Sequence, residues 1–493
     1  MKVIKRVFIG IIVVLLLLVG AIYFYPQLIF SSGFGQKMLL YFDGDEVATF
    51  YFKDNQTVKD SLYMRGVIYR NTFNDISDVL NKNPEVKTLV MIDVPGSIDD
   101  EINLLASQEI RKRNINTYIP KDGMVASGGT DMFIAGVERN AHFTAKFGVH
   151  SWSDGEKGGN QYPKDHPDHS LYLDYYAAMG VPSNFYWYTL DAAPAEEIHW
   201  MTQSELFGYE VLNNWKDEIL SLQKELSSDE YVGRGTGNNQ KSQELIINYF
   251  ENIGLEKFNS SYSSKFTFTN EETNVEQQGT NIIGYLKGEK FPNKYLVIGA
   301  HYDHLGIVND TIYNGADDNA SGTSALLVLA KHFADHRPQH SIIFAAFDAE
   351  ELGLQGSSYF VDNPPVPLED IKLDFNFDMI SRNPKNEIYV VGTYSYPQFK
   401  PLVAVQTLTS PLNVSYGHDD PQDETKDYWM FSSDNGPFHE KGIPNITFSE
   451  EDHSGYHRPT DDFENINPKY FQNVVHLIQR TIESIDENFP NRP

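Results

Sequence analysis

The sequence predicts an α/β protein in which an N-terminal membrane helix precedes two consecutive α/β domains. Three observations lead to this fold class. An uninterrupted apolar run covers residues 7–25, short β-rich runs alternate with helical stretches between about residues 38 and 212, and the C-terminal half places histidines and acidic residues directly after apolar, β-like runs. We therefore expect an anchor in residues 1–30, an α/β domain in residues 31–212, and a second in residues 213–493 with a mixed sheet flanked by helices.

The N-terminal segment has the features of an uncleaved membrane anchor. Lys2, Lys5 and Arg6 precede the apolar run Val7–Tyr25, which is long enough to span a bilayer as a helix. A cleaved signal peptide is the alternative, but Tyr23–Pro26 offers no small-x-small cleavage site. Because the positive charges lie on the short N-terminal side, we expect a single-pass protein whose domains face the periplasm or the cell exterior.

Composition excludes several classes of function. The chain has 68 acidic and 39 basic residues, a net charge of −29, which argues against nucleic acid and against an anionic membrane surface as partners. It contains no cysteine, so disulfides, thiolate zinc sites and cysteine nucleophiles are ruled out. Any metal site must therefore use imidazole and oxygen ligands.

The first domain is expected to contain a mainly parallel sheet. A β-like run over residues 62–68 is followed by a helical pattern near residues 75–81 and by another β-like run over residues 88–93. Strands that alternate with helices predict parallel pairing, because each crossover helix returns the chain to the same end of the sheet. A helical pattern that starts at Trp215 then begins the second domain.

Small residues occupy two strand-to-helix turns of the first domain, Val94-Pro95-Gly96-Ser97 and Ala126-Ser127-Gly128-Gly129. Over roughly residues 60–210 the chain resembles the Clp protease and crotonase fold. The resemblance implies that Ser127 is a nucleophile and that the amides of Gly96, Ser97 and Gly128 bind an oxyanion.

The sequence does not identify the histidine and the acidic residue that would act with Ser127. By the same resemblance His150 is structural, and His169 lies nearer to the expected position of a catalytic histidine. Asp191, Glu196 and Glu197 are all candidates for a third member. The turn is also explained by backbone geometry alone, so a domain that only oligomerises or presents substrate is an equal alternative.

The second domain carries a pattern typical of a metal site. Three segments, His301-Tyr302-Asp303, Gly315–Gly322 and Asp348–Glu351, are followed by Asp378 and His457. Imidazole and carboxylate ligands without thiolate suit catalytic zinc. Apolar, β-like runs precede three of these positions, at residues 295–299, 342–347 and 375–377.

Residues from about 216 to 493 resemble the co-catalytic zinc aminopeptidase family, which also includes glutamate carboxypeptidases and glutaminyl cyclases. The opening segment Leu226–Gly235 is similar to that of the family. The resemblance implies the following roles: His301 and Asp378 bind one zinc ion, Glu351 and His457 bind the other, Asp318 bridges them, Glu350 is the general base, Tyr456 stabilises the oxyanion, and Asp303 and Asp434 orient ligands. Asn435 departs from the family, which often has histidine there.

The sequence thus predicts a membrane-anchored, two-zinc exopeptidase acting on peptides, most simply an aminopeptidase. Within the family, a carboxypeptidase, a dipeptidase or a glutaminyl cyclase is the alternative. Outside it, the alternative is a binding or scaffold protein with a vestigial peptidase half. An oligomer formed through the first domain is a further expectation.

Overall fold

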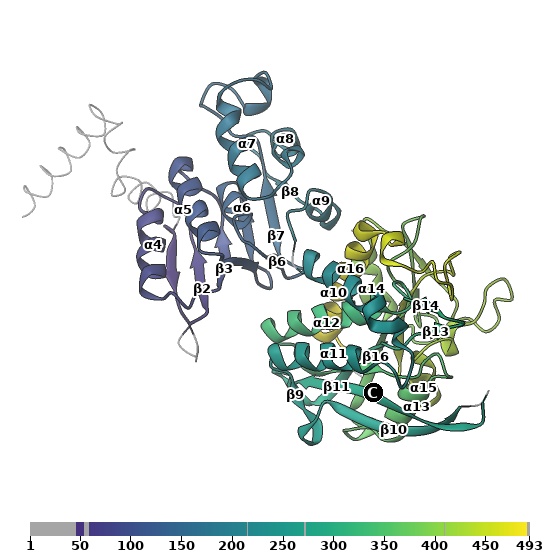
Figure 1. Ribbon diagram of the computed structural model, residues 1–493. Helices are drawn as coiled ribbons and strands as arrows, with labels where there is room; N and C mark the ends of the chain where they lie inside the picture. The colour runs from purple at the N-terminus through teal and green to yellow at the C-terminus, as the bar shows by residue number, and fades with distance from the viewer. Residues whose placement is uncertain (1–45, 54–58, 214, 271–272, 409, 491–493) are drawn as a thin grey trace, which may run out of the picture. The chain divides into compact units, whose positions relative to one another are not determined.

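The computed structural model describes residues 46–53, 59–213, 215–270, 273–408 and 410–490 (Figure 1). The chain divides into two compact units, residues 1–214 and 215–493. The predicted anchor, Val7–Tyr25, lies outside the described residues. Among the residues that are described, no helix is long and apolar enough to cross a membrane.

The first unit is built on an eight-stranded sheet with the order β1-β2-β3-β5-β7-β8, in which β4 pairs with β3 and β6. The inner pairs are parallel, and β1 and β8 add antiparallel edges. The strands are β1 (Thr49–Tyr51), β2 (Ser61–Arg65), β3 (Thr88–Val94), β4 (Asn116–Ile119), β5 (Met124–Ala126), β6 (Arg139–Ala141), β7 (Lys146–Val149) and β8 (His199–Trp200). The mainly parallel arrangement agrees with the strand–helix alternation of the sequence.

Helices follow the strands of this unit, as βαβ connections require. They are α4 (Thr72–Lys82), α5 (Asp100–Lys112), α6 (Gly128–Phe133), α7 (Asp168–Ala178), α8 (Ser183–Ala192) and α9 (Gln203–Gly208). Asp99 caps α5 by accepting a hydrogen bond from the amide of Ile102 at 3.3 Å. The short α6 begins directly after β5, so Ser127 is the single residue between a strand and a helix.

The second unit contains a nine-stranded mixed sheet with the order β10-β11-β15-β12-β16-β19-β17-β18, and β9 pairs with β11. The central strands β15, β12, β16 and β19 are parallel. The strands are β9 (Glu256–Lys257), β10 (Ser263–Asn270), β11 (Val275–Leu286), β12 (Phe291–His301), β15 (His340–Phe347), β16 (Ile371–Phe377), β17 (Glu387–Val391), β18 (Asn413–Tyr416) and β19 (Asn445–Ser449). A hairpin of β13 (Gly306–Val308) and β14 (Thr311–Tyr313) stands apart from this sheet.

Helices cover both faces of this sheet. They are α10 (Lys216–Leu226), α11 (Gln240–Asn252), α12 (Ala320–Asp335), α13 (Gln355–Asp362), α14 (Lys400–Thr407), α15 (Asn435–Glu440) and α16 (Pro468–Glu487). Every residue of β15 is buried, and its side chains alternate between two cores. Ile342 and Phe344 pack with α12 and α16, whereas Ile343 and Phe347 pack with α13 and α15. The sheet is thus the middle layer of three.

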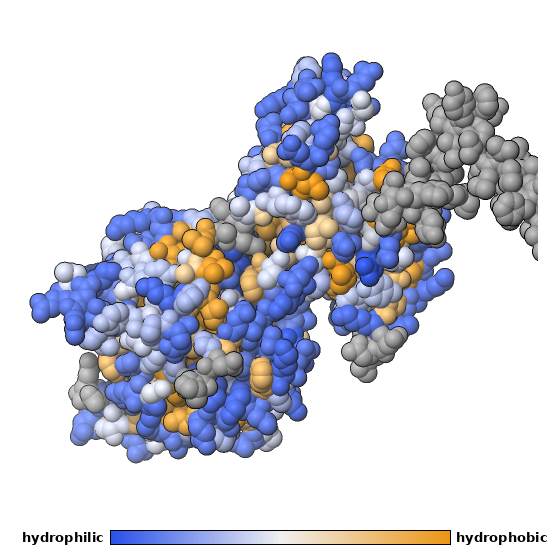
Figure 2. Space-filling view, turned by 180° about the vertical axis from the view of Figure 1, so that it is seen from behind, coloured by the Kyte–Doolittle hydropathy of each residue, from blue (hydrophilic) through white to orange (hydrophobic). Residues whose placement is uncertain are grey.

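The surface is in keeping with the acidic composition. Figure 2 shows one face of the protein, on which hydrophilic residues predominate and hydrophobic residues form small patches. The net charge of −29 explains such a solvated exterior.

Candidate metal centre

Three candidate metal ligands, His301, Glu351 and Asp378, lie at or just after the carboxyl ends of central parallel strands, whereas Asp318 precedes α12 and His457 lies in a loop after β19. His301 is the last residue of β12, Asp378 follows β16, and Glu350 and Glu351 follow β15 by three and four positions. Carboxyl ends of neighbouring parallel strands meet at one edge of a sheet, where open α/β sheets bind ligands. The β-like runs of the sequence therefore deliver these side chains to one place.

His301, Asp318 and Asp378 form the first group of donors. The Nε2 atom of His301 lies 3.4 Å from Asp378 Oδ1 and 3.5 Å from Asp318 Oδ1. His301 is 1% exposed and Asp318 is 3% exposed. Their donor atoms are close enough to share one metal ion.

His457, Asp318 and Glu351 form the second group. The Nε2 atom of His457 lies 3.2 Å from Asp318 Oδ2 and 3.2 Å from Glu351 Oε2. One oxygen of Asp318 therefore faces His301 and the other faces His457. A carboxylate in this position can bridge two cations.

His304 also belongs to the second group, and the sequence reasoning missed it. Its Nδ1 atom lies 2.7 Å from Glu351 Oε1 and 3.6 Å from Asp318 Oδ2, and the residue is 2% exposed. The signal was the histidine three positions after His301 in His301-Tyr302-Asp303-His304. The sequence does not show that the chain turns after β12 and brings the imidazole of His304 to the carboxylates of Asp318 and Glu351.

The loop that carries Asp318 is held by a buried framework. Asp461 accepts hydrogen bonds from the amides of Asp317 and Asp318 at 3.0 Å each. Arg234, 0% exposed, donates to the carbonyls of Tyr302 and Gly315 at 2.9 and 2.7 Å. Arg234 lies in the opening segment Leu226–Gly235, so that segment supports the site without contributing a ligand.

Asp317 is directed away from the metal ligands, which distinguishes it from its neighbour. Its Oδ1 atom accepts hydrogen bonds from the amide and hydroxyl of Ser381 at 2.7 and 2.8 Å. Its Oδ2 atom lies 3.1 Å from His453 Nε2. The structure thus brings Asp318, and not Asp317, to His301 and His457.

Several buried carboxyl groups lie close to histidine side chains in this site, and this crowding shifts their pKa values. Hydrogen bonds to Asp318 and Glu351 raise the pKa of His457 to about 10. Burial raises the pKa of Asp318, and the neighbouring Glu351 adds to the effect. Burial opposes ionisation of Glu351, yet its hydrogen bonds to His304 and His457 hold its pKa well below the usual range. A divalent cation would relieve this excess of negative charge.

Residues 281–482 match the model of Peptidase family M28. This match covers about two fifths of the chain and lies within the C-terminal unit, which we call the M28 unit. Three curated relatives are similar to the chain: "Aminopeptidase YwaD" of Bacillus subtilis, 32% identical over 222 residues (42% of this chain, 45% of that protein); a "Probable zinc metalloprotease" of Pyrenophora tritici-repentis, 33% identical over 150 residues (29% and 34%); and a "Glutamate carboxypeptidase 2 homolog" of Caenorhabditis briggsae, 32% identical over 123 residues (24% and 15%). In each case the alignment spans less than half of the relative's length. The printed names of these relatives describe an aminopeptidase, a zinc metalloprotease and a glutamate carboxypeptidase homologue.

The pocket of the M28 unit has a volume of about 110 Å³ and holds Glu350 and Tyr456 beside the ligands. Burial raises the pKa of Glu350 far above its usual range, His301 opposes the shift, and Asp378 adds to it. Burial and then Asp318 raise the pKa of Tyr456, whose ring stacks on that of His457 with centroids 3.9 Å apart. Both side chains therefore line the same pocket as Asp318, Glu351, Asp378 and His457.

Asp303 and Asp434 are buried carboxyl groups near the candidate ligands. The carboxylate of Asp303 lies 3.7 Å from Nδ1 of His301 and accepts a hydrogen bond from the amide of Glu350 at 3.1 Å. Asp434, 1% exposed, precedes α15, and burial raises its pKa to about 7. Asn435, the departure from the family pattern, donates to the carbonyl of Trp429 at 3.2 Å.

Ser127 lies in the first unit, which the M28 match does not reach. The Clp and crotonase resemblance of that unit has no support from the relatives and stays a prediction. Ser127 lines a pocket together with His150, whereas His169 is not among the residues that line it. His169 is buried, and its Nδ1 atom is hydrogen bonded to Tyr186 Oη at 2.6 Å.

Proposed function

We propose that the M28 unit is a two-zinc exopeptidase, specifically an aminopeptidase. The observation that carries this proposal is the position of Asp318, whose two oxygens face His301 on one side and His457 on the other. A single zinc ion would not require a carboxylate with a histidine at each oxygen. Two zinc ions bridged by Asp318 would explain why each of its carboxylate oxygens faces a histidine.

The donor set fits zinc. The side chains are imidazoles and carboxylates, which are common ligands of catalytic zinc, and the chain has no thiolate to compete with them. His301 and Asp378 would hold one ion, Glu351 and His457 the other. When bound, zinc polarises a substrate carbonyl and makes water acidic enough to act as a nucleophile at neutral pH.

Glu350 and Tyr456 would carry the proton and the oxyanion of peptide hydrolysis. The carboxylate of Glu350 takes the proton of the attacking water and passes it to the leaving amine. The hydroxyl of Tyr456 donates a hydrogen bond to the oxygen of the scissile carbonyl as negative charge develops there. The raised pKa of Tyr456 keeps this donor protonated at neutral pH.

The charge of the pocket favours a substrate with a free amino terminus. Besides the proposed ligands Asp318, Glu351 and Asp378 and the proposed base Glu350, the carboxyl groups of Glu450 and Asp452 line it. Among the described residues that line the pocket there is no lysine or arginine. A substrate ammonium group would be attracted here, whereas the carboxylate that a carboxypeptidase must bind would find no cationic side chain.

Aminoacyl 4-nitroanilides test this assignment. The full chain in detergent should cleave leucine 4-nitroanilide but not its N-acetylated form, lose the activity with a chelator and regain it with Zn²⁺. Elemental analysis should find two zinc ions per chain. Release of C-terminal residues from N-blocked peptides would identify a carboxypeptidase instead, and release of ammonia from an N-terminal glutamine would identify a cyclase. Full activity without metal would contradict the proposal. Binding of peptides without cleavage of any of these substrates would also contradict it and would favour a binding protein.

The location is proposed on the sequence alone. Lys2, Lys5 and Arg6 before the run Val7–Tyr25 favour a single-pass anchor with both units on the extracytoplasmic side. Peptides outside the cytoplasm would then be the substrates. Oligomer formation through the first unit is part of the same proposal.

A further inference from the structure

The first unit contains a small pocket that shares no residue with the candidate metal centre. Its volume is about 50 Å³. One water molecule requires ~10–15 Å³, so about four atoms of that size fit. The lining side chains come from α5, α6, α7 and α8 and from the segment after β7, and no lysine or arginine is among the described residues that line it. The pocket therefore suits a small group and offers it no positive charge.

Two carboxyl groups line this pocket, those of Asp100 and Asp131. Asp100 is the first residue of α5, where the helix dipole favours its ionised form. Asp131 Oδ1 accepts a hydrogen bond from Tyr176 at 2.7 Å, whereas its Oδ2 atom has no hydrogen-bond partner within the described part of the chain. Burial raises the pKa of Asp131 to about 7, the hydrogen bond from Tyr176 opposes the rise, and the nearby Asp100 adds to it. These carboxyl groups thus lie close together without a cationic side chain beside them.

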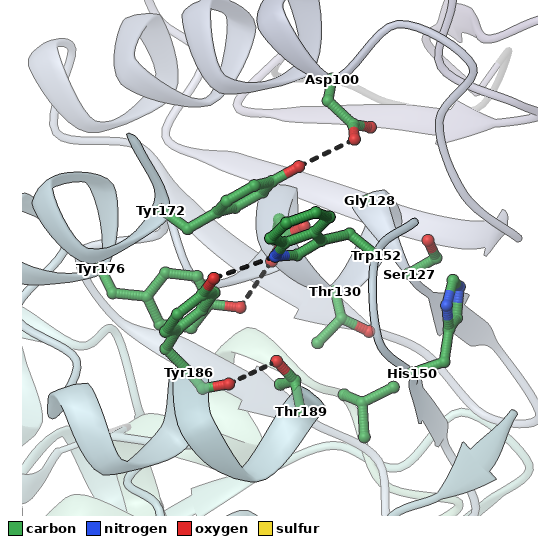
Figure 3. Close-up of a pocket in the computed structure, with 12 residues that line it drawn as sticks. Asp100, Ser127, Gly128, Thr130, His150, Trp152, Tyr172, Tyr176, Tyr186 and Thr189 are labelled. Carbon is green, nitrogen blue, oxygen red and sulfur yellow. Dashed lines mark hydrogen bonds between the residues drawn. The ribbon is translucent and has the colours of Figure 1, made fainter. Parts of the chain in front are cut away.

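The polar hydrogens around the pocket are directed at acceptors of the protein itself. Thr130 and Thr189 donate to main-chain carbonyl oxygens at 2.9 and 2.8 Å. The hydroxyl of Tyr172 donates to Asp100 at 2.9 Å, and the indole of Trp152 donates to a tyrosine hydroxyl at 2.9 Å (Figure 3). The oxygen atoms of the threonine and tyrosine hydroxyls keep lone pairs with which they can accept from a ligand.

His150 adds a further acceptor to the pocket that it lines. Its Nδ1 atom lies 2.8 Å from the carbonyl oxygen of Ser151. A carbonyl oxygen can only accept, so Nδ1 of the neutral ring carries the hydrogen and Nε2 is an acceptor. The pocket therefore presents acceptors to a ligand, and a ligand that donates several hydrogen bonds matches it.

Three nearly parallel aromatic rings lie beside the carboxyl groups. The rings of Trp152 and Tyr172 have centroids 6.4 Å apart and planes 10° apart, and those of Tyr172 and Tyr186 are 5.8 Å and 12° apart. Figure 3 shows these side chains on one side of the pocket, with Ser127 and His150 on the other. The face of an aromatic ring attracts a cation within about 6 Å of its centre. Aromatic faces and carboxylates together favour an organic cation.

The outer rings of this aromatic cluster already attract ammonium groups of the chain itself. Lys157 Nζ lies 5.7 Å from the ring centre of Tyr162, which stacks on Trp152 with centroids 5.7 Å apart. Lys164 Nζ lies 5.1 Å from the ring centre of Trp187. Neither lysine is among the residues that line the pocket. The rings inside the pocket therefore remain available to an ammonium group from another molecule.

We propose that this pocket binds a primary ammonium group on a short carbon chain, as a peptide presents on a lysine side chain or at its amino terminus. The N–H groups of the ligand donate to Asp131, to Asp100 and to the remaining acceptors of the wall. Its methylene groups pack on Trp152 and Tyr172. The first unit thus captures peptides through a positive charge, independently of zinc in the M28 unit.

Isothermal titration calorimetry of the zinc-loaded full chain in detergent tests this site, with butylammonium chloride as the probe. Asp131→Asn should weaken binding about tenfold or more, because the amide cannot form the charge-assisted hydrogen bond. Asp174→Asn is the matched control: it removes the same charge from an exposed position of α7 that does not line the pocket, and should keep the affinity. No binding of butylammonium, or equal affinities of the two variants, would overturn the proposal.

The chemistry of the ligand is tested by analogues of the probe. Tetramethylammonium has no hydrogen to donate and should bind at least about tenfold more weakly than butylammonium. Equal binding of the two would overturn the hydrogen-bonded site. N-acetyl-lysine methylamide and alanine amide distinguish the two sources of the ammonium group, and the tighter ligand identifies the source. Tighter binding of N-acetyl-arginine methylamide than of either would overturn the assignment to an ammonium group.

Photo-crosslinking locates the site without relying on the folding of any variant. A butylammonium derivative that carries a diazirine should, on irradiation of the wild-type chain, attach to the pocket wall, at Trp152 or Tyr172. Tandem mass spectrometry identifies the labelled residue, and excess butylammonium should suppress the label. Labels confined to the M28 unit, whose pocket is also acidic, would overturn the proposal.

Discussion

At the scale of single residues, Asp303 links His301, a proposed metal ligand, to Glu350, the proposed general base. Its carbonyl oxygen and carboxylate lie 3.2 and 3.7 Å from Nδ1 of His301, and the carboxylate accepts hydrogen bonds from the amides of Glu350 and Glu351 at 3.1 and 3.4 Å. One buried carboxylate thus sets the orientation of the imidazole and the position of the two glutamates. The roles of Glu350 and Glu351 differ because of what surrounds each side chain.

Glu350→Gln should keep zinc and lose most turnover. The amide has nearly the shape of the carboxylate but cannot accept the proton of the attacking water, and general acid–base catalysis contributes about 10²–10⁴-fold. Steady-state kinetics with leucine 4-nitroanilide and elemental analysis of the same preparation check both halves of this expectation. A variant that loses zinc would show that Glu350 is a ligand, and one with normal turnover would remove it from the mechanism.

His304→Ala should weaken zinc binding by about 10–100-fold, the usual cost of losing a side chain that supports a metal ligand. The reason is the 2.7 Å contact between His304 Nδ1 and Glu351 Oε1, which holds that carboxylate in place. Competition with a chelator of known affinity measures the change. His336→Ala, at the far end of α12, provides the matched control. Equal affinities for the two variants would show that His304 does not support the site.

At the scale of elements, α16 buries a histidine whose ionisation opposes folding. Burial lowers the pKa of His476 far below its usual range, and the cationic Arg480 and Lys469 lower it further. Its ring packs on Trp215 with centroids 4.4 Å apart. The helix therefore requires a neutral imidazole at this position.

His476→Phe should make the stability of the M28 unit less dependent on pH below about 6.5, the pKa of a free imidazole. In wild-type protein the unfolded chain binds a proton there that the folded chain does not, so stability falls as pH decreases. The slope due to one such group is at most ~1.4 kcal/mol per pH unit. Urea unfolding between pH 7 and pH 5.5 measures it, and His336→Phe should retain the wild-type slope. An undiminished slope in His476→Phe would contradict the assignment.

Helices and strands could be predicted from the sequence where the local hydrophobic pattern determines them. The helix expected near residues 75–81 is α4, and the strand expected over residues 88–93 is β3. The expected strand over residues 62–68 ends earlier, because Gly66 turns the chain at φ 98°. Hydrophobic periodicity does not report such a turn, which depends on backbone conformation at one residue.

At the scale of the whole molecule, the sequence indicated the ligands but not all of their neighbours. The motif order identified His301, Asp318 and Asp378, which the structure brings together. His304 was overlooked because its role depends on a distance between segments far apart in the chain: it meets Glu351, 47 positions away. Such proximity is a property of the fold and leaves no local signal.

The topology of the chain is testable in cells. Protease added to intact cells or spheroplasts should digest residues beyond 31, and the protein should sediment with membranes, because the charges before Val7 stay on the cytoplasmic side. Lysed cells provide the control for protease access. A soluble form that begins between residues 26 and 33 would show cleavage and contradict the anchor, and full protection in intact cells would contradict the orientation.

The placement of three proposed ligands, His301, Glu351 and Asp378, at or just after strand ends has a consequence for how the site can diversify. The sheet fixes where His301, Glu351 and Asp378 stand, but the pocket wall is completed by Trp429, Asp452 and other residues of connecting segments. Changes of length or sequence in those segments alter the pocket without disturbing the buried layers. Substrate preference can therefore drift in evolution while the reaction is conserved, and a library of variants confined to the segments 417–432 and 450–452, which leave Asp434 and Tyr456 unchanged, should yield altered specificity at little loss of folded protein.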